Sequence, residues 1–325
     1  MLSSRYRPWH VPVFLAKYAW LRVRRRPVLL NLEVTMRCNA RCGFCDYWKT
    51  PADARHQEVA DYAAIVRHFS PMLATFTGGE PTLRRDLEDI VRAVRQASRF
   101  TYLQLITHGG MLTVERAKAL WDAGLDQFNL SLDYLDERHD QARGIPGLAA
   151  RLQALVPAMR DVGIGGVRFN TVIKRDNLDQ LLPIAQRARA LGGGVNFSLY
   201  TDFKNGNREH LLTEAQHADL DEAVTGLLDY KHRHPGVITN SEHYLEQIPR
   251  YVRGELAQEP CRSGESTIHI DPQGRVRRCP DFPPDGPWEA YAGYQPINCD
   301  ACFYACRGEA QAPLRLRSRV RDVMA

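Results

Sequence analysis

The sequence predicts an α/β fold in which a parallel sheet, covered by helices on its outer side, curves around a lumen. Two observations lead to this prediction. Six segments of strand character alternate with helical segments, an order that produces parallel sheets. Several of these strands alternate apolar with polar residues, whereas parallel strands covered on both faces are normally apolar throughout. We therefore expect the apolar face to pack on helices and the polar face to line a binding cavity.

The predicted strands cover residues 29–35, 73–77, 102–107, 127–132, 167–173 and 195–199. Their alternating polar positions include Asn31, Glu33, Asn129, Ser131, Arg168, Asn170, Asn196 and Ser198. The simpler explanation for these residues is that they are strand-end groups whose hydrogen bonds are satisfied locally. A lumen explains better why the polar residues recur at every second position.

The predicted helices follow from a 3.6-residue apolar periodicity and from capping signals. They cover residues 85–98, 113–124, 148–162 and 178–191, and a further helix opens at the Thr213–Gln216 capping box. Thr113 is a suitable N-cap, and Gly124 a suitable terminator, for the second of them. Pro183 implies that the fourth begins late or bends.

Composition places the chain among globular proteins. It has 325 residues, 44% of them hydrophobic, and a formal net charge of +5. No apolar run is long enough to span a bilayer, and the N-terminus does not have the pattern of a secretory signal. The small positive charge gives little support for nucleic-acid binding. We expect a cytoplasmic protein.

The segment 1–27 predicts a basic N-terminal helix. One side of it carries Val11, Phe14, Leu15, Tyr18 and Leu21, and arginines follow at positions 24–26. Such a helix suits either an anionic membrane surface or the closure of one end of the barrel. Both hypotheses stay open at the level of sequence.

The eight cysteines fall into two groups that divide the chain. Three lie at positions 38, 42 and 45, and the other five lie between positions 261 and 306. In a chain without an export signal, such groups indicate metal sites rather than disulfides. The predicted division is a core over 28–235 and an extension, with its linker, over 236–325.

The first group, Cys38-x3-Cys42-x2-Cys45, directly follows the first strand. Three thiolates in one loop can hold three corners of a [4Fe–4S] cluster and leave the fourth iron open. Structural zinc requires four ligands, and this loop supplies three. A disulfide would leave one thiol over.

These residues, with Gly78-Gly79-Glu80-Pro81 after the second strand, resemble the radical S-adenosylmethionine (SAM) superfamily over residues 28–200. The resemblance implies a partial (β/α)6 TIM-like barrel with a small C-terminal iron–sulfur extension. It also implies an enzyme that cleaves SAM reductively to a 5′-deoxyadenosyl radical, which then abstracts hydrogen from a substrate. No acid–base catalytic residue is predicted.

The resemblance also implies a set of cofactor-binding residues. They are Phe44, Gly78, Gly79, Glu80, Thr107, Ser131, Asp133, Arg143 and Asn170. Phe44 would help to seat the adenine, and Arg143 would meet the SAM carboxylate unless it forms only a surface salt bridge. His108 stands where the family often has asparagine, which leaves its role open.

The second cysteine group resembles the twitch and SPASM extensions of the same superfamily, which hold auxiliary [4Fe–4S] clusters. Its candidate ligands are Cys261, Cys279, Cys299, Cys302 and Cys306. The twitch resemblance selects the first four. The last residues also resemble the tail of adenosylhopene-synthase-like proteins, which would replace Cys279 by Cys306. A zinc ribbon is the alternative to a cluster.

The predicted function is radical oxidation, cross-linking or adenosyl addition on a specialised small-molecule, lipid or peptide substrate. The cofactors would be SAM, the SAM-binding cluster and one auxiliary cluster. A reductase, flavodoxin or ferredoxin would donate electrons. The alternatives are a zinc-stabilised binding protein on a degenerate barrel and a cofactor- or RNA-modifying radical SAM enzyme.

Overall fold

The sheet is the organising element of the computed structural model, which describes residues 6, 8–50, 56–203, 205–256, 261–291, 293, 297 and 299–312. The strands in these ranges are β1 Leu29–Thr35, β2 Leu73–Gly78, β3 Tyr102–Thr107, β4 Gln127–Ser131, β5 Val167–Ile173, β6 Gly194–Leu199, β7 Thr267–Ile270, β8 Arg275–Arg277 and β9 Gly286–Pro287. Their spatial order is β6-β5-β4-β3-β2-β1-β7-β8-β9. Neighbours from β6 to β7 run parallel, whereas the last two pairs are antiparallel. The sheet curves without closing, as a partial barrel does.

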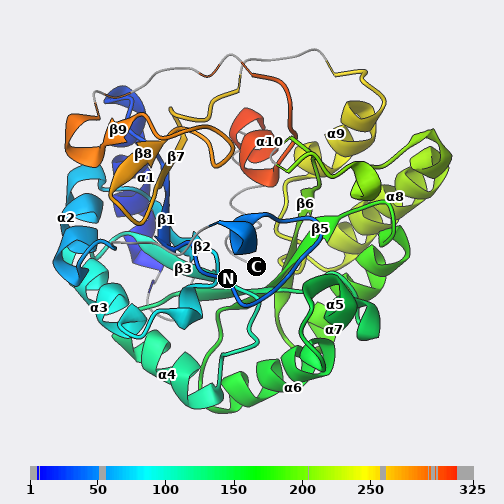
Figure 1. Cartoon of the computed structure of the whole chain (residues 1–325), viewed down its shortest axis with the longest axis horizontal. Helices are drawn as coiled ribbons and strands as arrows, with labels where there is room; N and C mark the ends of the chain where they lie inside the picture. Colours follow the sequence, from blue (N-terminus) through cyan, green and yellow to red (C-terminus); the bar gives the residue numbers. More distant parts are fainter. Residues whose placement is uncertain are drawn as a thin grey trace.

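Helices cover the outer side of the sheet (Figure 1). The described α-helices are α1 Val11–Val23, α2 Val59–Phe69, α3 Leu87–Ala97, α4 Val114–Ala123, α5 Glu137–Arg143, α6 Leu148–Asp161, α7 Leu181–Ala190, α8 His217–Arg233, α9 Glu242–Val252 and α10 Ala305–Gln311. In Figure 1, α2 to α8 follow the outside of the sheet, and α10 lies between α9 and the β7–β9 segment. None of the described helices has the length and hydropathy needed to cross a membrane.

The local signals in the sequence produce the elements that they predict. In α3, Leu87, Ile90, Val91 and Val94 are all buried. Burying each such side chain contributes about 1.5–3 kcal/mol, so the apolar stripe fixes which face meets the sheet. The Thr113 side chain accepts a hydrogen bond from the amide of Arg116, and the helix ends at Gly124. The predicted late start near Pro183 is confirmed, because a 3-10 turn precedes α7 and Pro183 falls in its first turn.

The inner face of the sheet lines a cavity of about 850 Å³, as the alternating pattern predicts. Register places polar side chains in layers along it. Asn31 pairs with Thr75, Gln104 with Gln127, Asn129 with Arg168, and Asn170 with Asn196. All of these residues line the cavity. Several amides bond one another, including the Gln127 Nε2 donor to Asn129 Oδ1 at 2.6 Å. The polar face is therefore the wall of a lumen rather than a set of isolated strand ends.

The C-terminal extension continues the core sheet. β7 pairs with β1 along the register from Leu29–Thr267 to Leu32–Ile270. Residues 236–252, assigned from sequence to the linker, also pack on the core. The Asn240 side chain bonds both backbone groups of Phe197 on β6, and Tyr244 accepts the amide of Leu199. Asn240 and Tyr244, which follow the predicted boundary at 235, therefore contact β6 of the core.

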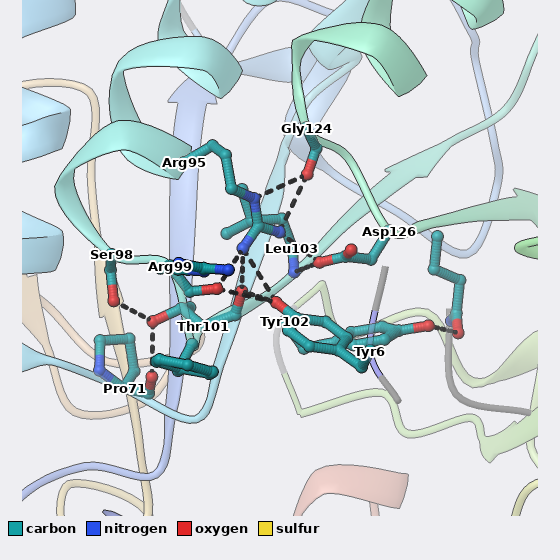
Figure 2. A network of polar contacts seen from close by, with 12 residues as sticks. Tyr6, Pro71, Arg95, Ser98, Arg99, Thr101, Tyr102, Leu103, Gly124 and Asp126 are labelled. Carbon is teal, nitrogen blue, oxygen red and sulfur yellow. Dashed lines mark hydrogen bonds and ion pairs between the residues drawn. The ribbon is translucent and has the colours of Figure 1, made fainter. Parts of the chain in front are cut away.

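A polar network holds the end of the barrel at which the strands begin (Figure 2). Arg95 of α3 donates to the carbonyls of Arg99, Thr101 and Gly124 and pairs with the buried carboxylate of Asp126. It also donates to the Tyr6 hydroxyl at 2.9 Å. The Tyr6 ring stacks on Tyr102 of β3, with centroids 6.2 Å apart. The segment before α1 is therefore attached to the end of the barrel at which the strands begin, which we call the closed end.

Helix α1 lies against the same end with the face that carries Phe14, Tyr18 and Leu21. Leu21 is fully buried, and Tyr18 and Arg22 line the cavity. The Lys17 ammonium donates to the Phe100 carbonyl at 3.0 Å. Of the face predicted for membrane contact, only Leu15 is exposed. That face closes the barrel, and the helix presents a second apolar face outward, formed by Val13, Leu15, Ala16, Ala19, Trp20 and Val23.

Candidate active site

The loop that carries Cys38, Cys42 and Cys45 begins where β1 ends. Its backbone is fixed from several sides. The Cys45 amide donates to the Cys42 carbonyl at 3.3 Å, and Trp48 Nε1 donates to the same carbonyl at 3.0 Å. The Arg41 amide donates to the carbonyl of Arg143 at 2.9 Å. Burial raises the pKa of Cys38 to about 11, and the other two thiols contribute to that rise. The three predicted ligands therefore share one ordered turn.

Gly78 and Gly79 lie directly against this loop. Gly78 has a φ of 121°, which disfavours other residues. A Cβ on Gly79 would lie 2.2 Å from the Arg37 carbonyl oxygen and 2.6 Å from that of Met36. The Gly79 amide donates to the Thr35 carbonyl at 2.7 Å. Gly79 therefore allows the backbone of the cysteine loop to approach closely. The sequence analysis predicted it as a cofactor-binding residue.

The Glu80 carboxylate is fully buried and engaged within the protein. Its Oε1 accepts the Thr82 amide at 3.0 Å and the hydroxyls of Thr82 and Thr107, each at 2.5 Å. Its Oε2 accepts the His108 amide at 2.9 Å. These four donors tie the ends of β2 and β3 together. The geometry is that of a residue that positions the backbone around the site.

His108, which departs from the family pattern, connects β3 to the cysteine loop. Its Nδ1 accepts the Gly110 amide at 2.9 Å, which leaves Nε2 to donate to Asn39 Oδ1 at 2.9 Å. Burial is the largest cause that lowers the pKa of His108. A neutral imidazole thus bridges the loop between the first two cysteines and the end of β3.

Arg143 forms a buried ion pair, so its interpretation as a surface salt bridge is wrong. Its Nη2 lies 2.7 Å from the Asp133 carboxylate, and the residue is 7% exposed. Its Nη1 approaches Cys42 Sγ at 4.0 Å, and its Cζ lies 5.3 Å from the centroid of the Phe44 ring. Its buried Nε has no hydrogen-bond partner among the described residues. A guanidinium beside the cysteines can balance the negative charge of a thiolate-bound cluster.

Asp133 positions the Arg143 guanidinium through this ion pair. Its Oδ1 accepts the Val172 amide at 2.9 Å. Burial would raise the pKa of Asp133, but the charges of Arg143, Lys174 and His139 hold it below its usual value. Asp133 and Ser131 are both buried at the end of β4, outside the residues that line the cavity, whereas Asn170 lines it.

Lys174 is a site residue that the sequence prediction omitted. It follows the end of β5, is fully buried and donates to the Tyr134 hydroxyl at 2.9 Å. Its ammonium lies 4.8 Å from the centroid of Phe44. Two cations therefore face one aromatic ring next to Cys45. A lysine directly after a predicted strand, at the same edge as the cysteines, was the available signal.

Glu33 is a second omitted residue, and it lies at the centre of a buried cluster at the end of β1. Its Oε1 accepts the Tyr47 hydroxyl at 3.0 Å and lies 3.3 Å from His269 Nδ1, while Arg277 lies 3.2 Å from Oε2. Burial would raise the pKa of Glu33, but these neighbours, His269 first, bring it below its usual value. The cluster links the cysteine loop to β7 and β8 of the extension.

The second cysteine group contains four thiols that act on one another. Burial raises the pKa of Cys302 to about 11, with a contribution from Cys261. Burial raises the pKa of Cys306 to about 12, with contributions from Cys302 and Cys261, and Cys302 and Cys306 help to raise that of Cys279. Cys299 contributes with Cys302 to the raised pKa of Tyr251, so it lies in the same region. The twitch resemblance selects Cys261, Cys279, Cys299 and Cys302 from these thiols, and the second resemblance replaces Cys279 by Cys306.

The residues present fit two iron–sulfur clusters in donor type and placement. One loop offers three thiols beside two buried cations, and the extension offers four neighbouring thiols. Within the described ranges, no three histidine, cysteine, aspartate or glutamate side chains form a site for a single metal ion.

Comparison with known proteins identifies the family. The radical SAM superfamily model matches residues 32–188. The chain is also 33% identical to the PqqA peptide cyclase of Methylocella silvestris over 267 residues, which cover 78% of this chain and 68% of that protein. The chain belongs to the radical SAM superfamily. It is an enzyme with the fold that its sequence predicts.

Two further relatives extend the comparison. The probable GTP 3′,8-cyclase of Thermoplasma volcanium is 29% identical over 275 residues, covering 78% of this chain and 80% of that protein. The crystal structure of Streptococcus suis SuiB bound to the precursor peptide SuiA has a TM-score of 0.67 at 17% identity, and the match covers 86% of this chain and 67% of that one. This structural likeness establishes the shared fold. Superfamily membership implies a [4Fe–4S] cluster and SAM as cofactors.

Proposed function

We propose that this enzyme uses SAM to abstract hydrogen from a polar substrate, a peptide or a small molecule, that enters the lumen. The observation that carries the proposal is the continuity of the cavity. Its lining runs from Phe44 and Cys45 of the cysteine loop to Gln127 and Arg168 near the starts of β4 and β5. A substrate in the lumen would therefore reach the site of SAM cleavage. The amide-rich wall favours a substrate with hydrogen-bonding groups over an aliphatic lipid.

The roles of the predicted residues follow from their places. Cys38, Cys42 and Cys45 would hold the cluster, which supplies the electron for reductive cleavage of SAM. Phe44, Gly78, Gly79, Ser131 and Asn170 would lie around SAM. Arg143 and Lys174 would balance charge beside Phe44. Glu80, Thr107 and Asp133 would act as positioning residues, because their polar groups are bonded within the protein.

The substrate class is supported by relatives of two kinds. One is named for a peptide and another for GTP, and both names imply polar substrates. Membership of a family of enzymes favours catalysis over the zinc-stabilised binding protein. The test is direct: anaerobic protein with dithionite and SAM should form 5′-deoxyadenosine and methionine. A protein that binds iron but yields neither product would contradict the proposal.

We propose an auxiliary cluster on Cys261, Cys279, Cys299 and Cys302, the set that the twitch resemblance selects. Replacing Cys279 with alanine should remove about four of about eight irons per chain and the spectrum of the second cluster. Cys306→Ala is the matched control and should leave both unchanged, because Cys306 is an exposed cysteine outside this set. Iron analysis and electron paramagnetic resonance of the two variants provide the measurement. The opposite result, with Cys306 required and Cys279 dispensable, would favour the adenosylhopene-synthase-like ligand set.

We also propose that the outward face of α1 binds anionic membrane surfaces. Val23 is 81% exposed, Leu15 58% and Trp20 43%, and the exposed arginines 24 and 25 follow. Apolar and aromatic side chains beside arginines suit the boundary between acyl chains and anionic headgroups.

The requirement for an electron donor, a reductase, flavodoxin or ferredoxin, stays a prediction.

Vesicle sedimentation checks the membrane proposal. The double variant Leu15→Glu and Val23→Glu should bind phosphatidylserine-containing vesicles at least about tenfold more weakly. It removes two apolar contacts and adds two negative charges, which the anionic vesicle surface repels. Val162→Glu is the control, because Val162 is an exposed apolar residue outside α1. Wild-type protein that stays in the supernatant at low salt would refute the anchor.

A further inference from the structure

Arg168 carries a guanidinium inside the lumen that no protein group neutralises. It is the second residue of β5, and it lines the cavity. Within the described part of the chain, its side chain makes neither a hydrogen bond nor an ion pair. This contrasts with the other arginines of the barrel interior and its closed end. Arg95 pairs with Asp126, Arg143 with Asp133, and Arg22 and Arg262 with Glu265.

The surroundings of Arg168 are polar but carry no opposite charge. Its strand neighbours in register are Asn129 on β4 and Gly194 on β6. The titratable group that acts on it is Tyr102, whose hydroxyl already donates to Gln127 Oε1 at 3.1 Å. Burial is the largest cause that lowers the pKa of Arg168. Arg168 is half-buried, and a guanidinium partly withdrawn from bulk water without a protein partner does not stabilise the fold.

The residues around Arg168 are fixed by contacts other than contacts to its guanidinium. A Cβ on Gly194, its register neighbour on β6, would meet the Val237 carbonyl oxygen at 2.9 Å and would lie at an ordinary contact distance of 3.6 Å from Arg168 Cγ. The nearby amides are held by one another, with Asn129 Nδ2 donating to Gln104 Oε1 at 3.0 Å and Gln104 Nε2 to Thr75 Oγ1 at 2.7 Å. A bonded amide wall does not collapse onto the guanidinium. The donors of Arg168 therefore stay directed at the lumen.

The position of Arg168 relative to the cysteine loop gives the lumen a polarity. Arg168 lies two residues before Asn170 on the same strand face, which is about 6.6 Å toward the closed end. The carboxylates that line the cavity, Asp46, Asp281 and Glu309, belong to the cysteine loop and the C-terminal extension. Among the groups that line the cavity, the positive charge of Arg168 thus lies deep in the lumen, and the carboxylates lie near the two cysteine groups.

We infer that Arg168 binds an oxyanion of the substrate, a carboxylate or a phosphate, and so orients the substrate with its reacting C–H bond toward SAM. This inference rests on the proposed function, because it assigns the substrate class of the same lumen. Guanidinium groups bind carboxylate and phosphate through two parallel hydrogen bonds, which fixes orientation as well as position. A substrate anchored in this way needs no further charge at its reacting end.

Oxyanion binding tests the inference with defined probes. Inorganic phosphate, pyrophosphate and glutarate are titrated into the anaerobic holoenzyme by calorimetry at constant ionic strength. At least one of them should bind with one site per chain. Arg168→Met should weaken that binding at least about tenfold, the equivalent of one charged hydrogen-bonding group. A preference for pyrophosphate indicates a phosphorylated substrate, and a preference for glutarate indicates a carboxylate.

Two further variants separate a binding role from a structural one. Arg168→Lys should restore part of the affinity, because it returns the charge without the planar donor pair. Arg189→Met, at an exposed arginine of α7, removes the same charge and should leave binding unchanged. Without added anion, Arg168→Met should raise the melting temperature by up to about 2–4 °C, because an unpaired, half-buried charge has been removed.

The inference is overturned if wild-type protein binds none of the three anions, or if Arg168→Met binds them as well as wild type does. A fall in melting temperature with unchanged anion binding would also overturn it and would assign Arg168 a purely structural role. Formation of 5′-deoxyadenosine by the wild-type protein tests the proposed function separately, so the failure of one is distinguishable from the failure of the other.

Discussion

Replacing Cys38, Cys42 and Cys45 together with alanine should abolish SAM cleavage and remove about four of about eight irons per chain. The physical reason is that all three thiols lie in one turn, and no other cysteine of the described chain lies in that turn. Without the cluster there is no reductant within reach of SAM. Product analysis by liquid chromatography, together with iron and sulfide determination, provides the measurement.

The control for this variant is internal. The auxiliary thiols lie on the extension, so their absorption and paramagnetic signals should survive the triple substitution. Loss of all iron would instead mean that the first cluster is needed for the extension to fold, which is a different result from a failed assignment. Residual 5′-deoxyadenosine formation at the wild-type rate would contradict the assignment of the loop.

Gly79→Val should lower SAM affinity by about two orders of magnitude and destabilise the protein by roughly 1–3 kcal/mol. A Cβ at this position would overlap the carbonyl oxygens of Arg37 and Met36, and both belong to the backbone of the cysteine loop. Backbone cannot rotate away as a flexible side chain can. The loop must shift, and the ligands and the SAM site shift with it.

Equilibrium dialysis with labelled SAM and thermal unfolding measure the two effects of Gly79→Val. Gly165→Ala is a matched control, because nothing lies within 4 Å of a Cβ at that position. The control should bind SAM as wild type does. If Gly79→Val retains wild-type SAM affinity and a full iron content, the close packing of this turn is not what holds the site.

Most of the core could be predicted from local patterns. The apolar stripe of α3, the Thr113 cap and the late start of α7 all depend on residues a few positions apart, so the sequence alone specifies them. The lumen could be predicted as well, because alternation along a strand fixes which side chains share a face. The cysteine loop was recognisable because its three thiols are separated by only a few residues.

The remainder of the site depends on contacts between distant segments. The burial of Arg143 requires α5 to pack against the cysteine loop. The hydrogen bonds from Thr107 and His108 to the Glu80 carboxylate require the ends of β2 and β3 to meet. No local spacing carries this information.

The sequence by itself therefore determined the family, the order of the elements, the polar inner face and the residues that form the cysteine loop. The tertiary structure decided how those residues are used. It placed α1 across the closed end of the barrel, and it assigned Gly79 to backbone packing. Within the described part of the chain, it also left Arg168 in the lumen wall without a hydrogen-bond or ion-pair partner. The physical reason is that periodicity and short motifs encode which face a side chain occupies, whereas charge pairing and close packing depend on what the rest of the chain brings to that face.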